Sequence, residues 1–105
     1  MLEITDETFN DDIASAKIVV IDVWASWCMP CRLFGKIFES VAEKNNSNDI
    51  KFFKMNGDYS PLAMATLVIT AIPSVVYYKD GELVTIKSGV QSEEQLIESI
   101  QNIIN

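Results

Sequence analysis

The sequence predicts an α/β fold with a central mixed five-stranded sheet flanked by four helices. Apolar runs of strand length alternate with segments whose apolar residues recur at helical spacing, as in parallel strands joined by helical crossovers. Near the end of the chain, two strand-like runs flank Lys79-Asp80-Gly81, which indicates an antiparallel hairpin. The 105 residues match the size of one compact domain, so we expect residues 1–105 to fold as a single unit.

The first strand and helix are short. Leu2–Thr5 has the composition of a strand, and Asp6 can serve as the N-cap of the helix that follows. The apolar face of this predicted helix is formed by Phe9, Ile13 and Ala16.

The middle of the chain repeats the strand-helix pattern. The apolar, β-branched run Ile18–Ala25 predicts a buried strand, and a helix is expected from about Pro30 to Lys44. Ile50–Met55 predicts a third strand, followed by a short helix that begins at about Ser60 or Pro61 and ends at Leu67.

The last third supplies the hairpin and a final helix. Its strands are predicted over Ser74–Tyr78 and Glu82–Lys87. The closing helix, Glu93–Ile104, is amphipathic, and Ser92 with Gln95 forms the sequence pattern of a capping box.

The only two cysteines lie in the run Trp27-Cys28-Met29-Pro30-Cys31, between a predicted strand and a predicted helix. Two residues three apart at the start of a helix have Cα atoms roughly 5–6 Å apart, which a disulfide can bridge without backbone movement. The helix N-terminus favours the thiolate of Cys28, so we expect Cys28 to be the nucleophile, with a pKa below about 8, and Cys31 to be the resolving thiol. Pro30 fits the first helical turn and removes one hydrogen-bond donor from the site.

Composition excludes several classes of function. The formal net charge is −7 with no cluster of Lys or Arg, which argues against binding to nucleic acid or to an anionic membrane. There is no histidine, and two cysteines cannot complete a tetrahedral metal site, so we expect no metal within one chain. No apolar stretch is long enough to cross a membrane, and the N-terminus lacks a signal pattern, so the expected location is the cytoplasm.

The chain resembles the thioredoxin family over essentially its full length. The run Trp27–Cys31 (WCMPC) is similar to the family's WCGPC, and Asp22 precedes it at the family's spacing. Ile72-Pro73 resembles the family's cis-proline motif, and Asp80-Gly81 and Gly89 fall at the family's hairpin and at the glycine beside its active site. The departures are Met29 and Lys36 in place of the usual glycine and proline. Val68 and Ala71 are two further departures, since the family usually has glycine at both positions.

The resemblance implies roles for further residues. Asp22 is the only charged residue in its apolar strand, so burial should raise its pKa above about 5.5. In the family this acid exchanges a proton with the resolving thiol, here Cys31, and Lys54 would be its charge partner. The resemblance also implies a substrate-binding surface on which the backbone of Ile72 pairs with an extended segment of substrate. Its expected members are Trp27, Met29, Pro30, Ile72, Pro73, Gly89 and Val90.

The expected function is that of a cytosolic thiol-disulfide oxidoreductase that reduces protein disulfides through Cys28 and Cys31, as an enzyme and electron carrier. The resemblance implies disulfide-containing protein substrates, a thioredoxin reductase or equivalent electron donor, a monomeric state, and no cofactor beyond the Cys28–Cys31 disulfide. Two alternatives stay open. One is a disulfide oxidase or isomerase, and the other is a non-catalytic thioredoxin-fold binding module or a Cu(I) or iron–sulfur carrier formed by two chains.

Overall fold

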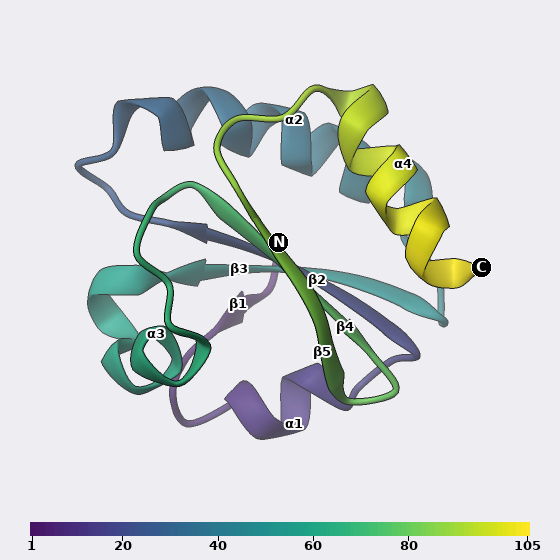
Figure 1. The fold of residues 1–105 in the computed structure, drawn as a ribbon, viewed down its shortest axis with the longest axis horizontal. Helices are drawn as coiled ribbons and strands as arrows, with labels where there is room; N and C mark the ends of the chain where they lie inside the picture. Colours follow the sequence, from purple (N-terminus) through teal and green to yellow (C-terminus); the bar gives the residue numbers. More distant parts are fainter.

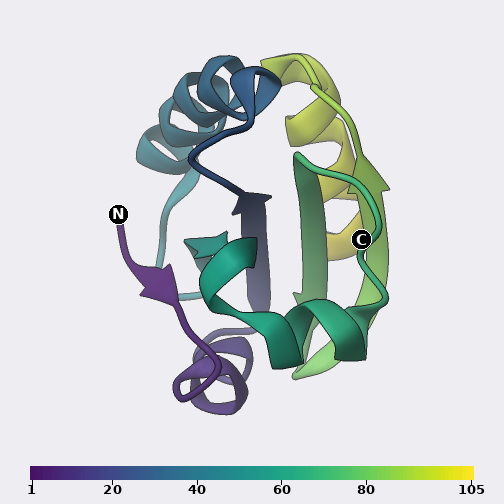
Figure 2. The same cartoon turned by 90° about the vertical axis from the view of Figure 1, so that its left-hand side faces the viewer.

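A computed structural model describes all 105 residues and contains the expected mixed sheet of five strands. The strand order is β1-β3-β2-β4-β5, in which β1, β3 and β2 are mutually parallel and β4 and β5 are antiparallel to their neighbours. Helices α2 and α4 cover one face of the sheet and α1 and α3 cover the other (Figure 1, Figure 2). The predicted fold class is therefore confirmed.

The elements follow one another in the predicted order. The strands are β1 (Glu3–Ile4), β2 (Ile18–Trp24), β3 (Ile50–Asn56), β4 (Ser74–Lys79) and β5 (Glu82–Ser88). The helices are α1 (Phe9–Ile13), α2 (Met29–Asn45), α3 (Pro61–Leu67) and α4 (Glu93–Ile104), with a single 3₁₀ turn, η1 (Gly57–Tyr59), before α3.

The side chains of β2 divide between two cores because successive residues of a strand point to opposite faces. Ile18 and Val20 pack with α2 and α4, around the fully buried Phe34 and Phe38 of α2. Val19, Ile21 and Val23 lie in the second core, with α3 and with partly buried residues of α1. The same alternation places Asp22 and Trp24 on the face that α2 covers.

Local signals predicted both the hairpin and the last helix correctly. Asp80 and Gly81 adopt positive φ angles of 53° and 78°, as a two-residue hairpin turn requires. The Ser92 hydroxyl accepts a hydrogen bond from the Gln95 amide, and the Gln95 side chain accepts one from the Ser92 amide, which completes the predicted capping box.

The prediction that Asp6 caps the first helix is wrong. Thr8 is the N-cap residue of α1 and makes no side-chain capping bond, while the Asp6 carboxylate accepts hydrogen bonds from the amides of Leu62 and Ala63 at 3.2 and 2.9 Å. These amides belong to the first turn of α3, whose own N-cap, Ser60, makes no side-chain capping bond. Asp6 therefore caps a helix that lies far along the chain, because α3 begins beside the end of β1.

The remaining differences concern element ends. The first strand is confined to Glu3–Ile4, and α1 ends at Ile13, so Ala16 lies beyond it and packs against the core from the following loop. Helix α2 begins one residue before Pro30, which leaves Cys28 as its N-cap.

Candidate active site

The two cysteines meet where the segment after β2 enters α2. Cys28 is the N-cap residue of α2, and its Sγ accepts a hydrogen bond from the backbone amide of Cys31 at 3.2 Å. The two residues form a disulfide, with their Cα atoms 5.3 Å apart, inside the range expected from the spacing. An amide and a helix N-terminus that both point at Cys28 favour negative charge on its sulfur once the disulfide is reduced.

An indole side chain lies beside this disulfide. Trp27 is 67% exposed, and its Nε1 donates a hydrogen bond to the carboxylate of Asp58 in η1 at 2.9 Å. A groove of about 170 Å³ runs from Trp27 to residues 69–72. The hydrogen bond orients the indole at this groove, which Ile72 also lines.

The loop that precedes β4 brings the second set of predicted residues to the cysteines. Ile72 packs against the small cluster formed by Ala25, Cys28 and Cys31. The Ile72–Pro73 peptide is cis, as predicted, and Pro73 is buried. Gly89, with φ of 95°, donates its amide hydrogen to the Pro73 carbonyl at 2.8 Å, which places it beside the proline.

The other predicted surface residues differ in exposure and position. Met29 is 67% exposed and Pro30 is exposed, both at the start of α2. Val90 is 43% exposed and lines a separate, mostly polar groove between β5 and α4.

Asp22 is fully buried in β2, and neither carboxylate oxygen has a hydrogen-bond partner. Burial raises the pKa of Asp22 from 3.8 to about 7, partly opposed by the positive charge of Lys54 and increased by the negative charge of Glu39. Lys54 is the direct neighbour of Asp22 in the β2–β3 register. The raised pKa agrees with the sequence prediction and makes Asp22 able to take up and release a proton near neutral pH.

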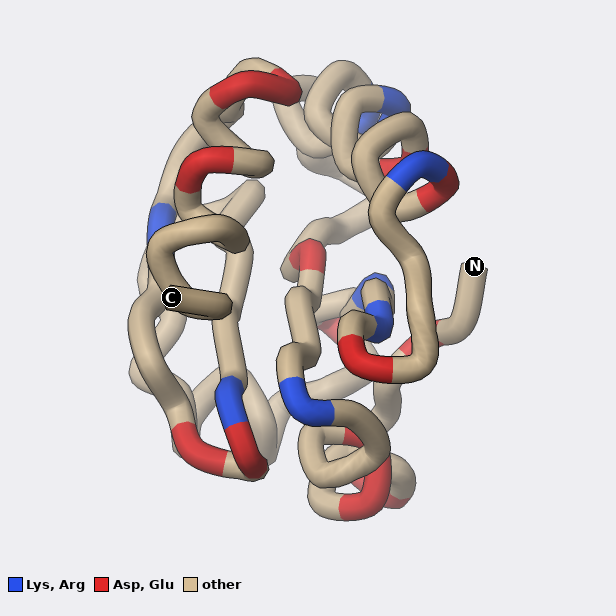
Figure 3. Tube along the Cα trace, turned by 90° about the vertical axis from the view of Figure 1, so that its right-hand side faces the viewer, with Lys and Arg blue, Asp and Glu red and all other residues tan.

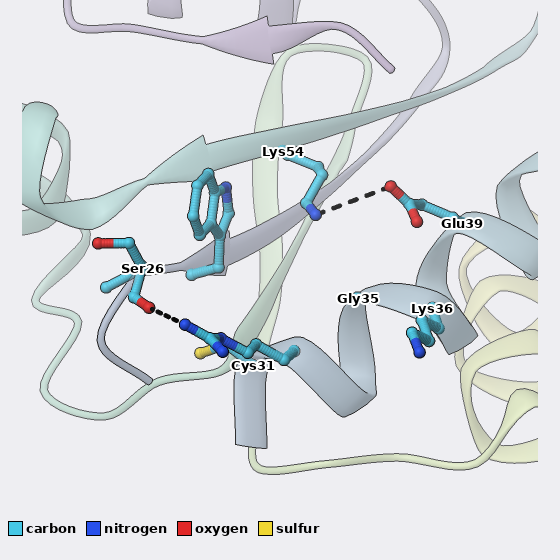
Figure 4. A pocket seen from close by; sticks show the side chains of 9 residues that line it. Ser26, Cys31, Gly35, Lys36, Glu39 and Lys54 are labelled. Carbon is cyan, nitrogen blue, oxygen red and sulfur yellow. Dashed lines mark hydrogen bonds and ion pairs between the residues drawn. The ribbon is translucent and has the colours of Figure 1, made fainter. Parts of the chain in front are cut away.

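A second pocket, of about 290 Å³, opens between α2 and the ends of β2 and β3 (Figure 4). Cys31, Lys54 and Glu39 line it, so Cys31 and the lysine share one solvent-accessible space. The Lys54 ammonium lies 5.2 Å from the centre of the Trp24 ring and 3.9 Å from Glu39 Oε1. Asp22 does not line the pocket and lies deeper, under α2.

Sequence reasoning missed several residues of this site. The sequence marks Asp58 only as part of a turn after β3, yet this residue orients Trp27. Gly35 and Glu39 occur in α2 without any distinguishing sequence signal, although their spacing of four residues places them on one helix face. Both residues belong to the site because they lie close to Lys54, which approaches α2 from strand β3.

No three residues among His, Cys, Asp and Glu come together in a group that could hold a metal ion. Lysine and arginine are scattered among the more numerous acidic residues along the trace (Figure 3). None of the helices has the length and apolar character needed to cross a membrane.

A disulfide between closely spaced cysteines at a helix N-terminus, beside a cis-proline loop and a buried acid, defines a thiol-disulfide oxidoreductase. Comparison with known proteins identifies the family: the thioredoxin family model matches residues 1–102, and the chain belongs to this family. A thioredoxin from Rickettsia bellii is 35% identical over 102 residues, which cover 96% of both chains, and one from Listeria monocytogenes is 34% identical over 97% of both. The chain is thus a protein disulfide reductase of the thioredoxin type.

Solved structures agree with the fold. A thioredoxin of Halobacterium salinarum, determined as a point mutant, superposes with a TM-score of 0.86 at 25% identity, over 96% of this chain and 88% of that one. The thioredoxin of Malassezia sympodialis gives a TM-score of 0.83 at 28% identity, over 93% and 87% of the two chains.

Proposed function

We propose that this protein reduces disulfides of other proteins in the cytoplasm through a mixed disulfide at Cys28. The observation that carries the proposal is the position of Cys28 as the N-cap of α2, with its sulfur accepting the Cys31 amide. Such a sulfur is stabilised as a thiolate, and the thiolate is the attacking species in disulfide exchange.

The reaction takes place in two exchange steps. In the first, the Cys28 thiolate attacks one sulfur of the substrate disulfide, forming a mixed disulfide and releasing the other substrate sulfur as a thiolate. In the second, Cys31 loses its proton and attacks Cys28 Sγ, which releases the substrate thiolate and forms the Cys28–Cys31 disulfide. Two electrons pass from the protein to the substrate, and the released substrate thiolates take up two protons.

Asp22 is the proposed proton acceptor for Cys31. Its pKa of about 7 means that the carboxylate and the carboxylic acid are both populated at neutral pH. Lys54 lines the same pocket as Cys31 and is the register neighbour of Asp22, so its charge can stabilise the ionised form of Asp22. The proton leaving Cys31 would reach Asp22 through water, because Asp22 itself does not line the pocket.

The proposed substrate-binding surface surrounds the disulfide. Trp27 and Ile72 both line the groove, and Met29 adds an exposed apolar side chain next to Cys28. We assign to this surface Trp27, Met29, Pro30, Ile72, Pro73, Gly89 and Val90. An extended substrate segment would pair with the backbone of Ile72 beside Cys28.

The proposed partners follow from this chemistry. After each turnover the disulfide must be reduced again, which requires a thioredoxin reductase or an equivalent donor of two electrons. A dithiol that acts as a reductant is maintained in a reducing compartment, which supports a cytoplasmic location. The thiols carry the electrons themselves, so the cycle uses no additional cofactor, and a single chain acting as a monomer contains every group named above.

Trapping the mixed disulfide tests the proposal. Cys31→Ser should accumulate proteins linked through Cys28 when it is mixed with oxidised protein substrates, while Cys28→Ser should accumulate none. The redox equilibrium of the wild-type pair with glutathione separates a reductase from an isomerase, since protein disulfide isomerase has a potential of about −180 mV. Failure of Cys31→Ser to trap any substrate, or a potential near that value, would contradict the reductase assignment.

A further inference from the structure

Lys54 has two acidic neighbours. One is Asp22, which is buried beneath α2 and adjacent to Lys54 in the sheet register. The other is Glu39 of α2, whose Oε1 is 3.9 Å from the Lys54 ammonium and whose side chain is about half exposed, at 53%. Figure 4 shows the lysine extended along the pocket toward Glu39. Because one lysine cannot neutralise both acids fully, the position of its charge decides how strongly each carboxylate is stabilised.

The surface of α2 leaves room for this arrangement. A Cβ atom at position 35 would lie 3.4 Å from Lys54 Nζ, and glycine at that position leaves the space free. On its other side the ammonium faces the ring of Trp24 at 5.2 Å. The Lys54 ammonium therefore lies near Gly35, the Trp24 ring and Glu39.

The charged and titratable groups around Asp22 come from two elements. Strand β3 contributes Lys54, and β4 opposes Asp22 with the apolar Val75. Arg32 is engaged elsewhere, because it donates a hydrogen bond to the Ser26 carbonyl at 3.4 Å. The groups from α2 that border the pocket are Cys31, Arg32, Lys36 and Glu39.

We propose that Glu39 is a positioning residue of the exchange reaction, which holds the Lys54 ammonium toward the pocket mouth and so sets the pH at which Asp22 accepts the Cys31 proton. The inference rests on the proposed role of Asp22 in disulfide reduction. Glu39 acts in two ways with the same sign: it draws a positive charge away from Asp22, and it adds a negative charge nearby. Both effects favour the neutral form of Asp22, and the direction agrees with the contribution of Glu39 to the raised pKa of Asp22.

The test compares two substitutions that remove one negative charge each from α2. Glu39→Gln should lower the pKa of Asp22, measured by carboxyl NMR titration of the oxidised protein, by about half a pH unit or more. Glu43→Gln is the matched control, since Glu43 is exposed on the same helix and makes no ion pair with Lys54. Glu43→Gln should leave the Asp22 pKa within about 0.2 units of the wild-type value, because solvent and salt screen the charge of an exposed glutamate.

A kinetic measurement adds a readout that a structural role would not change. The rate at which Cys31 resolves the mixed disulfide should depend on pH, with a midpoint set by Asp22. In Glu39→Gln this midpoint should move to lower pH by the same amount as the Asp22 pKa measured by NMR. In a Lys54→Met background, Glu39→Gln should shift the Asp22 pKa less, because the lysine through which it acts is gone.

The outcomes distinguish this inference from the proposed function. An unchanged or raised Asp22 pKa in Glu39→Gln, or an equal shift in Glu43→Gln, would overturn the role of Glu39. An equal shift in the Lys54→Met background would overturn the mechanism through Lys54. The Asp22 pKa could shift as expected while the rate of mixed-disulfide resolution does not change with pH around that pKa. This result would contradict the proposed proton transfer by Asp22 and would leave the electrostatic role of Glu39 supported.

Discussion

Val68 occupies a backbone conformation that ordinary side chains avoid. It follows the last residue of α3 with φ of 55° and ψ of 45°, and its side chain is 75% exposed. A left-handed conformation costs an L-residue roughly 1–2 kcal/mol, and a branched Cβ makes it less favourable still. Because most of the Val68 side chain is exposed, its packing does not offset the free-energy cost of this backbone conformation.

Val68→Gly should therefore stabilise the protein by about 1 kcal/mol, since glycine adopts this conformation without the steric cost. Urea denaturation of the two proteins measures the difference. Val68→Ala serves as the control because it removes the same exposed methyl groups and keeps a Cβ, and it should recover less than half of the gain. Equal stability of the glycine and valine proteins would show that residue 68 is not strained.

Asp22 carries the largest electrostatic cost at a single residue. Its pKa is about 7 in the folded protein against 3.8 for an unperturbed aspartate, so the folded state binds the proton more tightly. Stability then falls as pH rises from about 4 to about 7 and levels off above that range. Most of this cost is therefore present at neutral pH, where the proposed reaction operates.

Asp22→Asn should reveal that cost. At pH 8 the variant should be more stable than the wild type by roughly 2–4 kcal/mol, because it removes a buried charge at nearly constant volume. At about pH 4 the two proteins should differ by less than about 1 kcal/mol, since the aspartate is then neutral when folded. A difference that does not change with pH would mean that Asp22 is not the group whose pKa is raised.

At the scale of elements, α3 depends on a residue that lies outside it. Its first-turn amides at Leu62 and Ala63 bond to both oxygens of Asp6, and a negative charge at a helix N-terminus is favourable. The segment before α1 therefore stabilises a helix on the same face of the sheet, and that helix leads into the loop that carries Ile72.

Asp6→Ala should lower the free energy of unfolding by about 1–2 kcal/mol, the usual value for loss of an N-cap. Glu7→Ala is the matched control, because it removes the neighbouring acid, which makes no side-chain hydrogen bond, and it should change stability by less than about 0.5 kcal/mol. Thermal denaturation at one pH compares all three proteins. Equal effects of the two substitutions would mean that the loss of net charge, and not the cap, is responsible.

Asp6 also shows where sequence reasoning ends. Patterns that depend on residues close in the chain were predicted correctly, such as the Asp80-Gly81 turn and the capping box at Ser92 and Gln95. The partner of Asp6 could not be predicted, because an aspartate before a helical pattern looks the same whether it caps that helix or another one. The choice between α1 and α3 is made by tertiary packing.

The candidate site likewise contains residues that the sequence predicts and residues that it does not. The cysteines and the cis-proline loop are recognisable from their motifs, and the burial of Asp22 follows from its apolar strand. Glu39 and Gly35 meet Lys54 only after α2 packs across β3, and an exposed glutamate in a helix carries no sign of such a contact. Sequence periodicity indicates which face a residue occupies, and it does not indicate which side chain of another element lies opposite.

For the whole molecule, the disulfide links the redox reaction to folding. It closes a loop of only a few residues, and the chain-entropy model gives about 2 kcal/mol for such a loop. The oxidised protein should therefore be more stable than the reduced protein by about this amount, and both should unfold in one cooperative transition, as expected for a domain of this size.

Guanidinium denaturation with and without a reducing agent measures the difference in stability. By linkage, this difference in unfolding free energy corresponds to the difference between the redox potentials of the cysteine pair in the folded and in the unfolded protein. If the oxidised protein is the more stable form, folding makes the disulfide harder to reduce. A reduced protein that is more stable than the oxidised one would describe a strong oxidant and would contradict the proposed direction of electron flow.

The contact between Asp6 and α3 has a further consequence for local opening of the native state. Besides the β1–β3 pairing at Glu3 and Ile4, two sets of hydrogen bonds attach the N-terminal segment: Asp6 accepts the amides of Leu62 and Ala63, and the Leu2 carbonyl accepts the amide of Lys54 at 3.0 Å. If residues 1–8 detach as a unit, all three amides lose their partners in the same event, although they belong to different elements. Their hydrogen-exchange rates should then give one common opening free energy. The Met64 amide donates instead to the carbonyl of Ser60, the N-cap residue of α3, and should exchange more slowly.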